Sequence, residues 1–515
     1  MIHCSDRIVN VKCYGTSFQK KMKAQFADCV KAAYLLRMQQ PTQHARANTS
    51  GLSGTAALPG IVDSLRSTVD RGETLPGEKR KAHLKALYKG IQKHERALLD
   101  ALKTDLNKCE TEAFSNEVGI VYAEISFILK RLKRWMRPRR IVPDLHLLPG
   151  KARVVRDPYG VSLIIAPWNY PVQLLLSPLV GALAGGNTVI LKPSEVAPAS
   201  AAALTRMVED SLDPSVVRVV NGGPETSTAL LDLPVDHIFF TGSVPVGKIV
   251  MEAASRRLTP LTLELGGKSP AVVAADADLE VAARRIAWGK FNNAGQTCVA
   301  PDYVLVHESV FAELVMYLKQ ALELFYGDRP QDNENYGRII NDRHWDRLAA
   351  LAGPADRTSA PLLYGGGMDR DDRYIAPTLH GPVEDGDPLM QDEIFGPLLP
   401  IQTYRDTDEA IRRLRARPKP LAQYVFTRDR TTAYRFTREV PFGGGAINTT
   451  ILHVASSRLP FGGVGPSGMG SYHGRHSFEA FTHPKSILTQ PLRPDLGLAY
   501  PHRALDLAWV RKLLR

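Results

Sequence analysis

The spacing of apolar residues divides the chain into a helical region followed by regions of alternating strands and helices. Between about residues 56 and 136, apolar positions such as Ile61, Leu65 and Val69 recur mostly at intervals of three and four, which predicts amphipathic helices. Nearly continuous apolar strands that alternate with helices predict a parallel, doubly wound sheet. Five short apolar runs after the helical region show this pattern: Val161 to Ala166, Thr188 to Leu191, Val216 to Val220, His237 to Phe240 and Leu261 to Leu265.

A second alternation of strands and helices follows. Strands are predicted at 303–306, 398–402 and 423–426, and helices at 309–325, 408–415 and 431–438. This pattern predicts a second α/β domain, so we expect an α/β protein with two doubly wound domains. Side chains at the junction of two such domains are well placed to line a cleft.

The segment from Val161 to Leu191 contains no charged residue over 31 positions. It is long enough to suggest a membrane-spanning helix. Three prolines and several polar residues break it into strand, loop, helix and strand. We therefore predict that the segment is buried in an α/β core, and its loop around Asn169 becomes a candidate for chemistry.

Much of the positive charge of the chain lies at its N-terminus. The 515 residues carry a formal net charge of +12. Residues 1–50 contain eight lysines and arginines against Asp6 and Asp28, which is half of this excess. No motif that reads DNA or RNA accompanies the charge, so we predict a solvated surface and no nucleic-acid partner. The basic start is compatible with an organelle presequence or with a poorly ordered extension over residues 1–55.

Five scattered cysteines form neither a disulfide framework nor a zinc-binding spacing. We therefore predict free thiols in a reducing, cytoplasmic compartment and no metal site. Cys298 ends the run Gly295-Gln296-Thr297-Cys298 and follows Glu264 by 34 positions. A thiol can add to an electrophilic carbon, and a nearby carboxylate can take a proton from the thiol or from water. A lone cysteine is more often a small buried hydrophobe, but small and polar neighbours favour a reactive one here.

Three glycine-rich segments could bind phosphate. The run Gly463 to Gly468 fits the pattern GxGxxG, but no strand precedes it. The run Gly242 to Ile249 follows a predicted strand and opens a predicted helix, but Ile249 replaces the Ser or Thr that would hold magnesium in a P-loop. The third run, Gly266-Gly267-Lys268-Ser269, has Thr262 where the first glycine of a P-loop should stand.

A dinucleotide is the predicted guest of the turn that contains Gly242, Ser243 and Gly247. Backbone N–H groups at the start of the following helix can bind its phosphates. Lys192 and Glu195 follow another predicted strand, where a lysine can donate to ribose oxygens and a carboxylate can accept from ribose hydroxyls. A helix cap and a simple tight turn are the structural alternatives for these two segments.

Taken together, these segments resemble the aldehyde dehydrogenase superfamily over roughly residues 60 to 490. The subgroup resembles class 3, whose members are dimeric enzymes acting on fatty and aromatic aldehydes, because of the runs Cys298 to Tyr303 and Pro460 to Gly474. Val244 departs from the threonine common in other branches. Six segments match the superfamily in order: Ala166 to Pro171, Leu191 to Glu195, Phe240 to Ser243, Leu263 to Lys268, Gly295 to Cys298 and Glu393 to Pro397.

The resemblance implies a role for each site residue. Cys298 is the expected nucleophile, Asn169 and the Cys298 backbone N–H bind the oxyanion, and Glu264 activates water. The cofactor is expected to be NAD, with NADP as an alternative, because a carboxylate beside the ribose 2′-hydroxyl repels a 2′-phosphate. The expected cofactor-binding residues are Trp168, Lys192, Glu195, Gly242, Ser243, Gly247, Glu393 and Phe395.

The resemblance also implies a small bridging or oligomerisation element and a homodimer. The predicted segments are a dinucleotide-binding domain over 56–263 with a bridging excursion near 137–158, a catalytic domain over 264–443, a bridging segment over 444–490 and a tail over 491–515. Apolar and basic residues in the tail could touch a membrane surface, but we favour packing on the fold. The expected substrate is a medium- or long-chain aliphatic or an aromatic aldehyde.

Three other functions remain open. A cofactor-independent thiol hydrolase or acyltransferase would use Cys298 with a histidine such as His473. A P-loop nucleotide switch would be built on Gly242 to Lys248, and a non-catalytic binding protein would keep the fold without turnover. Reduction of NAD in the presence of an aldehyde distinguishes a dehydrogenase from all three.

Overall fold

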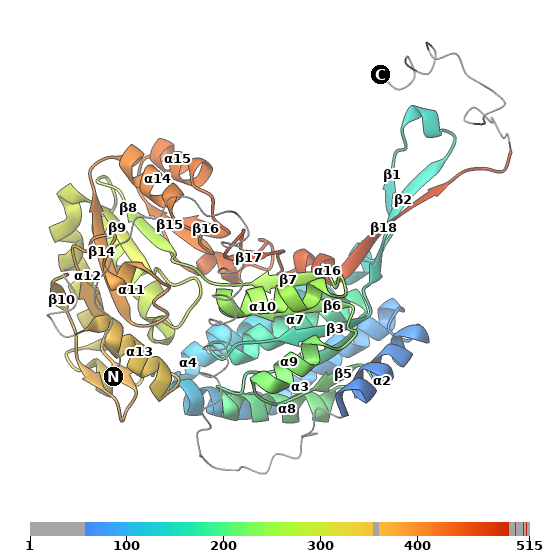
Figure 1. Ribbon diagram of the computed structural model, residues 1–515, viewed down its shortest axis with the longest axis horizontal. Coiled ribbons are helices and arrows are strands. Elements are labelled where there is room, and N and C mark those ends of the chain that lie inside the picture. Colours follow the sequence, from blue (N-terminus) through green and yellow to red (C-terminus); the bar gives the residue numbers. More distant parts are fainter. Residues whose placement is uncertain (1–56, 354–359, 494–499, 501–507, 509–510, 512–515) are drawn as a thin grey trace, which may run out of the picture. The chain divides into compact units, whose positions relative to one another are not determined.

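The computed structural model describes residues 57–353 and 360–493, together with residues 500, 508 and 511. The predicted N-terminal extension over 1–55 lies outside the described residues, as does most of the predicted tail over 491–515. The described strands form two large sheets, a three-stranded sheet and a two-stranded sheet (Figure 1).

A six-stranded sheet holds the first set of predicted strands. Its order is β17-β7-β6-β3-β4-β5, and neighbouring strands are parallel except for β17 and β7. All five strands predicted from apolar runs are present, each within one or two residues of its predicted ends. The strands are β3 (Val161–Ile165), β4 (Thr188–Lys192), β5 (Val217–Val219), β6 (His237–Thr241), β7 (Leu261–Glu264) and β17 (Gly468–Met469).

Helices cover both faces of this sheet, which confirms the doubly wound fold. In β3, Leu163 belongs to the same apolar cluster as Leu65 of α2, whereas Ile164 belongs to the cluster of Leu175 in α7. Successive residues of a strand point to opposite faces, so the two clusters lie on opposite sides. The helices of this half are α2 (Leu58–Asp70), α3 (Gly77–Leu106), α4 (Glu110–Ala113), α5 (Gly119–Leu129), α6 (Leu132–Trp135), α7 (Pro171–Gly185), α8 (Pro198–Ser211), α9 (Pro224–Leu231) and α10 (Val244–Ser255).

A seven-stranded sheet holds the second alternation. Its order is β10-β13-β14-β9-β8-β15-β16, and only β10 is antiparallel to its neighbour. Its strands are β8 (Pro270–Val273), β9 (Tyr303–His307), β10 (Leu362–Tyr364), β13 (Thr378–His380), β14 (Leu398–Tyr404), β15 (Ala422–Phe426) and β16 (Gly444–Ile447). The accompanying helices are α11 (Leu279–Phe291), α12 (Phe311–Tyr326), α13 (Asp342–Ala352), α14 (Thr407–Ala416) and α15 (Arg430–Glu439).

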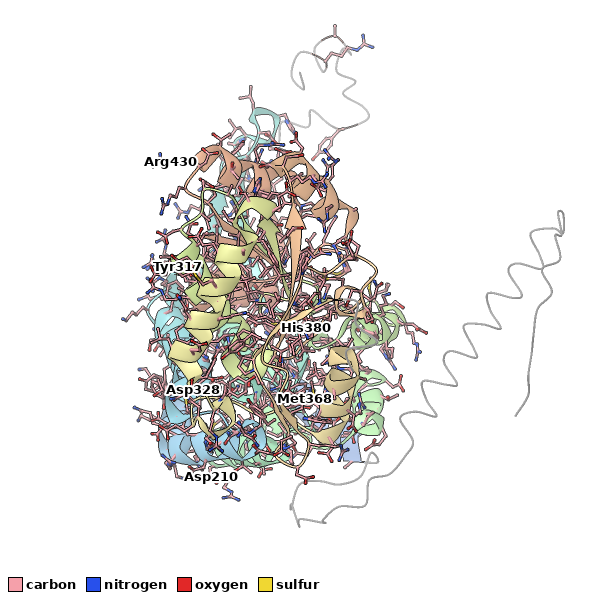
Figure 2. All side chains as sticks on the ribbon, turned by 90° about the vertical axis from the view of Figure 1, so that its left-hand side faces the viewer. Asp210, Tyr317, Asp328, Met368, His380 and Arg430 are labelled. Atoms are coloured by element: carbon pink, nitrogen blue, oxygen red, sulfur yellow. The ribbon has the colours of Figure 1, made fainter. Side chains whose placement is uncertain are left out.

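Side chains fill the space between these helices and strands (Figure 2), where Tyr317 marks α12 and His380 marks the end of β13. The two-stranded sheet consists of β11 (Met368–Asp369) and β12 (Tyr374–Ile375). Strand β8 and helix α11 were not predicted from the sequence. Strand β8 has only four residues and begins at a proline, so it offers too little pattern for its type to be recognised.

The three-stranded antiparallel sheet joins segments that are more than 300 positions apart. Strand β2 (Lys151–Pro158) pairs with β1 (Arg139–Ile141) on one side and with all eight residues of β18 (Thr482–Thr489) on the other. The predicted excursion near 137–158 contains strands β1 and β2 of this sheet. The third strand, β18, comes much later in the chain and directly follows helix α16 (Arg475–Ala480). The predicted bridging segment over 444–490 begins with β16. This strand, residues 444–447, belongs to the seven-stranded sheet.

The uncharged segment from 161 to 191 forms β3, α7 and most of β4, and every residue of these three elements is buried. In the part of the chain that the structure describes, no helix combines the length and the apolar character needed to cross a membrane.

Candidate active site

Cys298 lies in a short loop between helix α11 and strand β9. The loop turns sharply because Asn293, Ala294 and Gly295 have φ angles of 51°, 50° and 75°. A Cβ atom at Gly295 would lie 2.3 Å from the carbonyl oxygen of Gly396. The loop therefore needs glycine at position 295 both for its backbone conformation and for its close approach to the segment that follows Glu393.

The side chain of Gln296 fixes this turn from within. Its amide nitrogen donates to the carbonyl oxygens of Asn293 and Arg338, at 3.1 and 2.9 Å, and its oxygen accepts from the N–H of Ile340 at 3.0 Å. All of these groups are buried, so the bonds are shielded from water. Cys298 is thus held by a rigid loop.

Glu264 is the last residue of β7 and is 2% exposed. Burial raises its pKa to about 8, and the nearby Cys298 thiol and Thr241 hydroxyl partly oppose this shift. Neither carboxylate oxygen has a hydrogen-bond partner among the described residues. A buried carboxylate without a partner is costly, and one with a perturbed pKa beside a thiol is typical of a functional site.

Burial also raises the pKa of the Cys298 thiol well above its ordinary value, and the carboxylates of Glu264 and Glu393 add to this effect. The thiol is therefore protonated at neutral pH and needs a base to become a nucleophile. Glu264 lies close to this thiol, because each group shifts the pKa of the other. The structure thus brings together the two groups that stand 34 positions apart in the sequence.

Asn169 lies in the loop between β3 and α7 and is 2% exposed. Its side-chain amide nitrogen donates to the carbonyl oxygen of Gln296 at 3.0 Å. This bond uses one of its two hydrogens and leaves the other for a second acceptor. Tyr170, the next residue, shares a hydrogen bond of 2.6 Å with the hydroxyl of Thr297. Asn169 therefore lies against the loop that carries Cys298.

Three polar residues in contact with Asn169 or its loop were not predicted. Lys108 and Asn293 both donate to the carbonyl oxygen of Asn169, at 2.8 and 2.9 Å, and Glu117 pairs with Lys108. All three side chains are buried. No local sequence signal marks them, because Lys108 and Glu117 lie within a region that reads only as helical.

Five of the residues predicted to contact the cofactor, Lys192, Glu195, Gly242, Ser243 and Gly247, lie at or just after the carboxyl ends of β4 and β6 and in the first turn of α10. Lys192 and Glu195 form an ion pair of 2.5 Å. Gly242 and Ser243 precede α10, whose first turn has neither a side-chain cap nor an acidic residue. Its N-terminal N–H groups and positive dipole end therefore fit a phosphate. At Gly247 a Cβ atom would be 2.7 Å from the side chain of Leu265, so glycine allows close packing there.

Glu393 and Phe395 approach the site from the other half of the molecule. The carboxylate of Glu393 lies against Gly266, where a Cβ atom would be 2.3 Å from one of its oxygens. Burial raises the pKa of Glu393 to about 8, with Asp302 adding to the shift. Phe395 has a φ of 50° and makes an edge contact with Trp168 at 5.4 Å between ring centroids. Strained backbone of this kind is common at ligand sites.

His473 does not fit the role of a base for Cys298. Its ring is 4% exposed and stacks on Phe461 at 5.3 Å. Burial lowers its pKa to about 3, so its ring is a weak base at neutral pH. The thiol hydrolase alternative is therefore not favoured.

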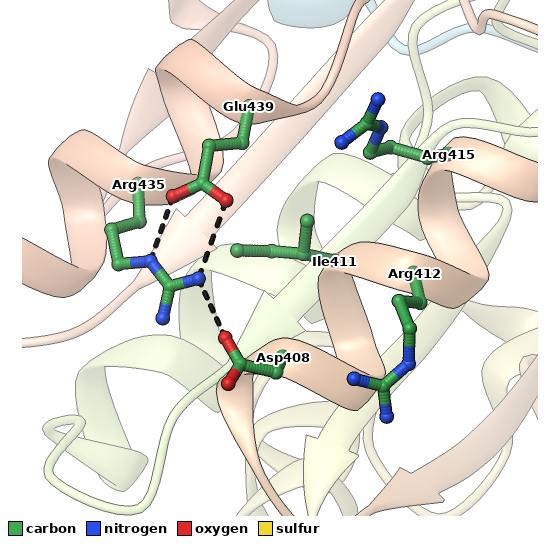
Figure 3. Close-up of a pocket in the computed structure, with 6 residues that line it drawn as sticks. All are labelled: Asp408, Ile411, Arg412, Arg415, Arg435 and Glu439. Carbon is green, nitrogen blue, oxygen red and sulfur yellow. Dashed lines mark hydrogen bonds and ion pairs between the residues drawn. The ribbon is translucent and has the colours of Figure 1, made fainter.

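A shallow pocket lies elsewhere, between helices α14 and α15 (Figure 3). Arg435 bonds to Glu439 and to Asp408 across it, and Ile411, Arg412 and Arg415 complete its lining. None of the predicted site residues lines this pocket, and its exposed ion pairs are typical of a solvated surface.

Comparison with known proteins places this geometry in a family. The aldehyde dehydrogenase family matches residues 36–487. The 4,4′-diaponeurosporen-aldehyde dehydrogenase of Staphylococcus aureus is 48% identical over 422 residues, which cover 82% of this chain and 91% of that protein. The dimeric, NADP-preferring aldehyde dehydrogenase of Mus musculus is 44% identical over 438 residues, which cover 85% of this chain and 96% of that protein.

A solved structure agrees with this result. The substrate-bound state of Staphylococcus aureus AldH has a TM-score of 0.86 and 45% sequence identity, and the match covers 88% of this chain and 99% of that chain. The resemblance to class 3 is confirmed, because class 3 enzymes are among the relatives. The chain therefore belongs to the aldehyde dehydrogenase family, and it catalyses the NAD(P)-dependent oxidation of an aldehyde.

Proposed function

We propose that Cys298, Asn169 and Glu264 carry the reaction. Glu264 accepts the proton of the Cys298 thiol, and the thiolate adds to the aldehyde carbon to form a thiohemiacetal. The side-chain amide of Asn169 and the backbone N–H of Cys298 donate to the resulting oxyanion. The observation that carries this proposal is the convergence of a partly buried thiol, a buried carboxylate without a hydrogen-bond partner and a buried amide around the Cys298 loop.

The second half of the reaction releases the acid. When bound, the oxidised nicotinamide supplies a hydride acceptor. Loss of hydride from the thiohemiacetal leaves a thioester on Cys298. Glu264 first releases the proton of the thiol to solvent and is again a carboxylate. It then takes a proton from the water that attacks the thioester carbon, and it returns this proton to the sulfur as the carboxylic acid leaves, which restores the thiol.

The residues present fit a dinucleotide. The uncapped N-terminus of α10 offers backbone donors to the phosphates. The Lys192–Glu195 pair would hold the adenosine ribose, and Glu393 and Phe395 would hold the nicotinamide ribose and ring. These contacts are what the resemblance to the aldehyde dehydrogenase family implies for these residues, and the chemistry of their side chains is compatible with them.

Glu195 is proposed to favour NAD over NADP, because its carboxylate would oppose a 2′-phosphate. The ion pair with Lys192 partly neutralises that carboxylate, which explains how NADP could also be accepted. The variant Glu195→Gln should raise kcat/KM for NADP relative to NAD by about tenfold, a change of roughly 1.4 kcal/mol. An unchanged ratio, or a wild-type enzyme that strongly prefers NADP, would show that Glu195 does not set the preference.

The proposed substrate is a medium- or long-chain aliphatic or an aromatic aldehyde. Support comes from the 48% identical relative, which is named a 4,4′-diaponeurosporen-aldehyde dehydrogenase. We also propose a homodimer in a cytoplasmic compartment. A dimeric relative supports the assembly, and free rather than disulfide-bonded Cys109 and Cys298, among the described residues, are compatible with a reducing compartment.

The test is the absorbance of reduced nicotinamide in the presence of NAD and a panel of hexanal, longer aliphatic aldehydes and benzaldehyde. We expect reduction with the wild-type protein and none with Cys298→Ala. Full reduction by the alanine variant would eliminate Cys298 as the nucleophile. A ranking of the panel by kcat/KM would define the substrate class, and a preference for short aldehydes would contradict the proposed one.

A further inference from the structure

The carbonyl oxygen of Asn169 is held by a buried ion pair that lies outside the set of family residues discussed above. The Nζ of Lys108 donates to this carbonyl at 2.8 Å and to the carboxylate of Glu117 at 2.5 Å. Both side chains of the pair are completely buried. The carbonyl oxygen of residue 169 thus accepts from a buried charged donor as well as from Asn293 of the Cys298 loop.

The same ammonium group also contacts the next residue of the loop. The Nζ of Lys108 lies 3.9 Å from the centre of the Tyr170 ring, which is a cation–π distance. The hydroxyl of Tyr170 shares its hydrogen bond with Thr297, the residue before Cys298. Lys108 therefore contacts the loop of Asn169 and Tyr170 directly. It is linked to the Cys298 loop through the side chain of Tyr170.

Glu117 extends the network to helix α7. Its second carboxylate oxygen accepts from the backbone N–H groups of Val172 and Gln173, at 2.8 and 3.4 Å. The helix has no side-chain cap from its own N-cap residue, Tyr170. Glu117 is thus a cap supplied from a distant element, and its negative charge lies at the positive end of the helix dipole.

The backbone that carries Glu117 is itself unusual. Residues Phe114–Val118 form a π-helix between α4 and α5. Such one-turn widenings are rare and occur frequently at functional sites. Here the π-helix contains the residue that bridges Lys108 and α7, so the irregular turn and the ion pair form one unit.

Stability alone does not account for a buried ion pair. Removing two charges from water costs free energy that their attraction often fails to recover, and apolar replacements are often as stable. What the pair does provide is direction, since its hydrogen bonds fix the loop in one position. An oxyanion donor must be placed within a fraction of an ångström to act on the transition state.

We propose that Lys108 and Glu117 are positioning residues that hold the Asn169 amide in place for oxyanion binding. The inference rests on the proposed role of Asn169. Neither residue touches the aldehyde in this assignment. Their effect on the reaction passes through the carbonyl of Asn169, the ring of Tyr170 and the N-terminus of α7.

The first test compares Lys108→Met with Lys93→Met, a control on the exposed face of α3. We expect Lys108→Met to lower kcat for aldehyde oxidation by about 10- to 100-fold. The KM for NAD and the rate of Cys298 alkylation by iodoacetamide should stay within about threefold, because neither needs the Asn169 amide. Equal kcat for both lysine variants, or a parallel loss of alkylation, would overturn the proposal.

The second test separates positioning from folding. The double variant Lys108→Met/Glu117→Gln removes both charges and keeps an acceptor for the N–H of Val172. We expect a melting temperature near that of the wild type together with a kcat that stays low. A double variant with wild-type kcat would show that the loss in Lys108→Met comes only from leaving Glu117 as a buried charge without its partner. That result would overturn the positioning role.

The third test asks whether the pair acts through Asn169. Adding Lys108→Met to Asn169→Ala should cause little further loss of kcat, because the amide that Lys108 positions is already gone. Losses that multiply would contradict this route. Wild-type kcat in Asn169→Ala would instead overturn the proposed oxyanion role, whereas a loss there with wild-type kcat in Lys108→Met would overturn only the positioning role.

Discussion

Asn169 offers the sharpest test among single residues, because its amide is proposed to act in the transition state. The variant Asn169→Ala should lower kcat by on the order of 100-fold or more, the usual effect of losing an oxyanion donor. Its melting temperature should change little in comparison, since the backbone carbonyl of residue 169 keeps its bonds from Lys108 and Asn293. Steady-state kinetics and a thermal melt check both statements.

An Asn169→Ala variant that kept wild-type kcat would contradict the oxyanion role. Loss of both activity and fold would assign the side chain a structural role instead. Asn169→Asp serves as a matched variant of the same size, and we expect it to be at least as impaired, because a carboxylate repels the developing negative charge.

Glu264 predicts a pH dependence of known direction. Its folded pKa is raised to about 8 by burial. A protonated carboxyl group cannot accept a proton. We therefore expect kcat/KM to be low at pH values below about 8 and to increase as the pH rises through about 8. The pH–rate profile of wild type and Glu264→Gln checks this, and the variant should lose about 100-fold or more in rate. A wild-type profile that is flat from pH 6 to 9 would exclude this base.

At the scale of single residues, the sequence allowed Cys298, Glu264 and Asn169 to be named as the proposed nucleophile, base and oxyanion amide, and the structure brings them together. It did not reveal Lys108, Glu117 or Asn293. Charged and amide residues are common in helical segments, and their contacts with the carbonyl of Asn169 join positions as much as 124 apart. Such contacts are made by packing and leave no local pattern.

At the scale of elements, the turn before Cys298 depends on Gly295. Its φ is +75°, and a Cβ atom there would meet the Gly396 carbonyl oxygen at 2.3 Å. Gly327 is a matched control, because its φ is +70° and its Cβ position is open. We expect Gly327→Ala to lose about 1 to 2 kcal/mol of stability from its left-handed backbone, and Gly295→Ala to lose more.

Chemical denaturation of the two alanine variants measures this difference. Gly295→Ala should also lower kcat, because the thiol loop must move to relieve the contact, while Gly327→Ala should not. Equal losses of stability in both variants would show that the contact with Gly396 is relieved at no cost. Wild-type kcat in Gly295→Ala would show that the loop tolerates the shift.

Elements that coincide with an apolar run bounded by turn signals were predictable, including the short strands β5 and β7, and irregular elements were not. The apolar runs of β3, β4 and β6 appear as strands within one or two residues of their predicted ends. Strand β8, with four residues, and the π-helix Phe114–Val118 have no signature of their own. Their conformations are imposed by neighbouring strands and by the bonds of Glu117.

At the scale of the whole molecule, the activity should not need the first 55 residues. The described fold begins with α2 at Leu58, and all proposed site residues follow residue 107. Deleting residues 2–55 should therefore leave kcat/KM for the best aldehyde within about twofold of the full chain. It should also remove roughly half of the net positive charge, which ion-exchange elution would show.

A truncated enzyme that lost activity while retaining its melting temperature would give the N-terminal segment a part in catalysis or substrate entry. The full chain is the control for both measurements. The domain boundaries predicted at 263 and 443 stay predictions, and strand β16 at 444–447 pairs within the sheet of the residues that precede it.

The sequence by itself determined the doubly wound α/β class, the family resemblance and the identity of the thiol, carboxylate and amide. These depend on local periodicity and on short runs such as Gly295 to Cys298, which can be read one segment at a time. Only the tertiary structure decided that burial raises the pKa of Glu264 and Cys298. It also decided that Lys108, which is paired with Glu117, donates to the carbonyl oxygen of Asn169. Burial and charge partners are set by segments far apart in the chain, and no stretch of sequence carries them alone.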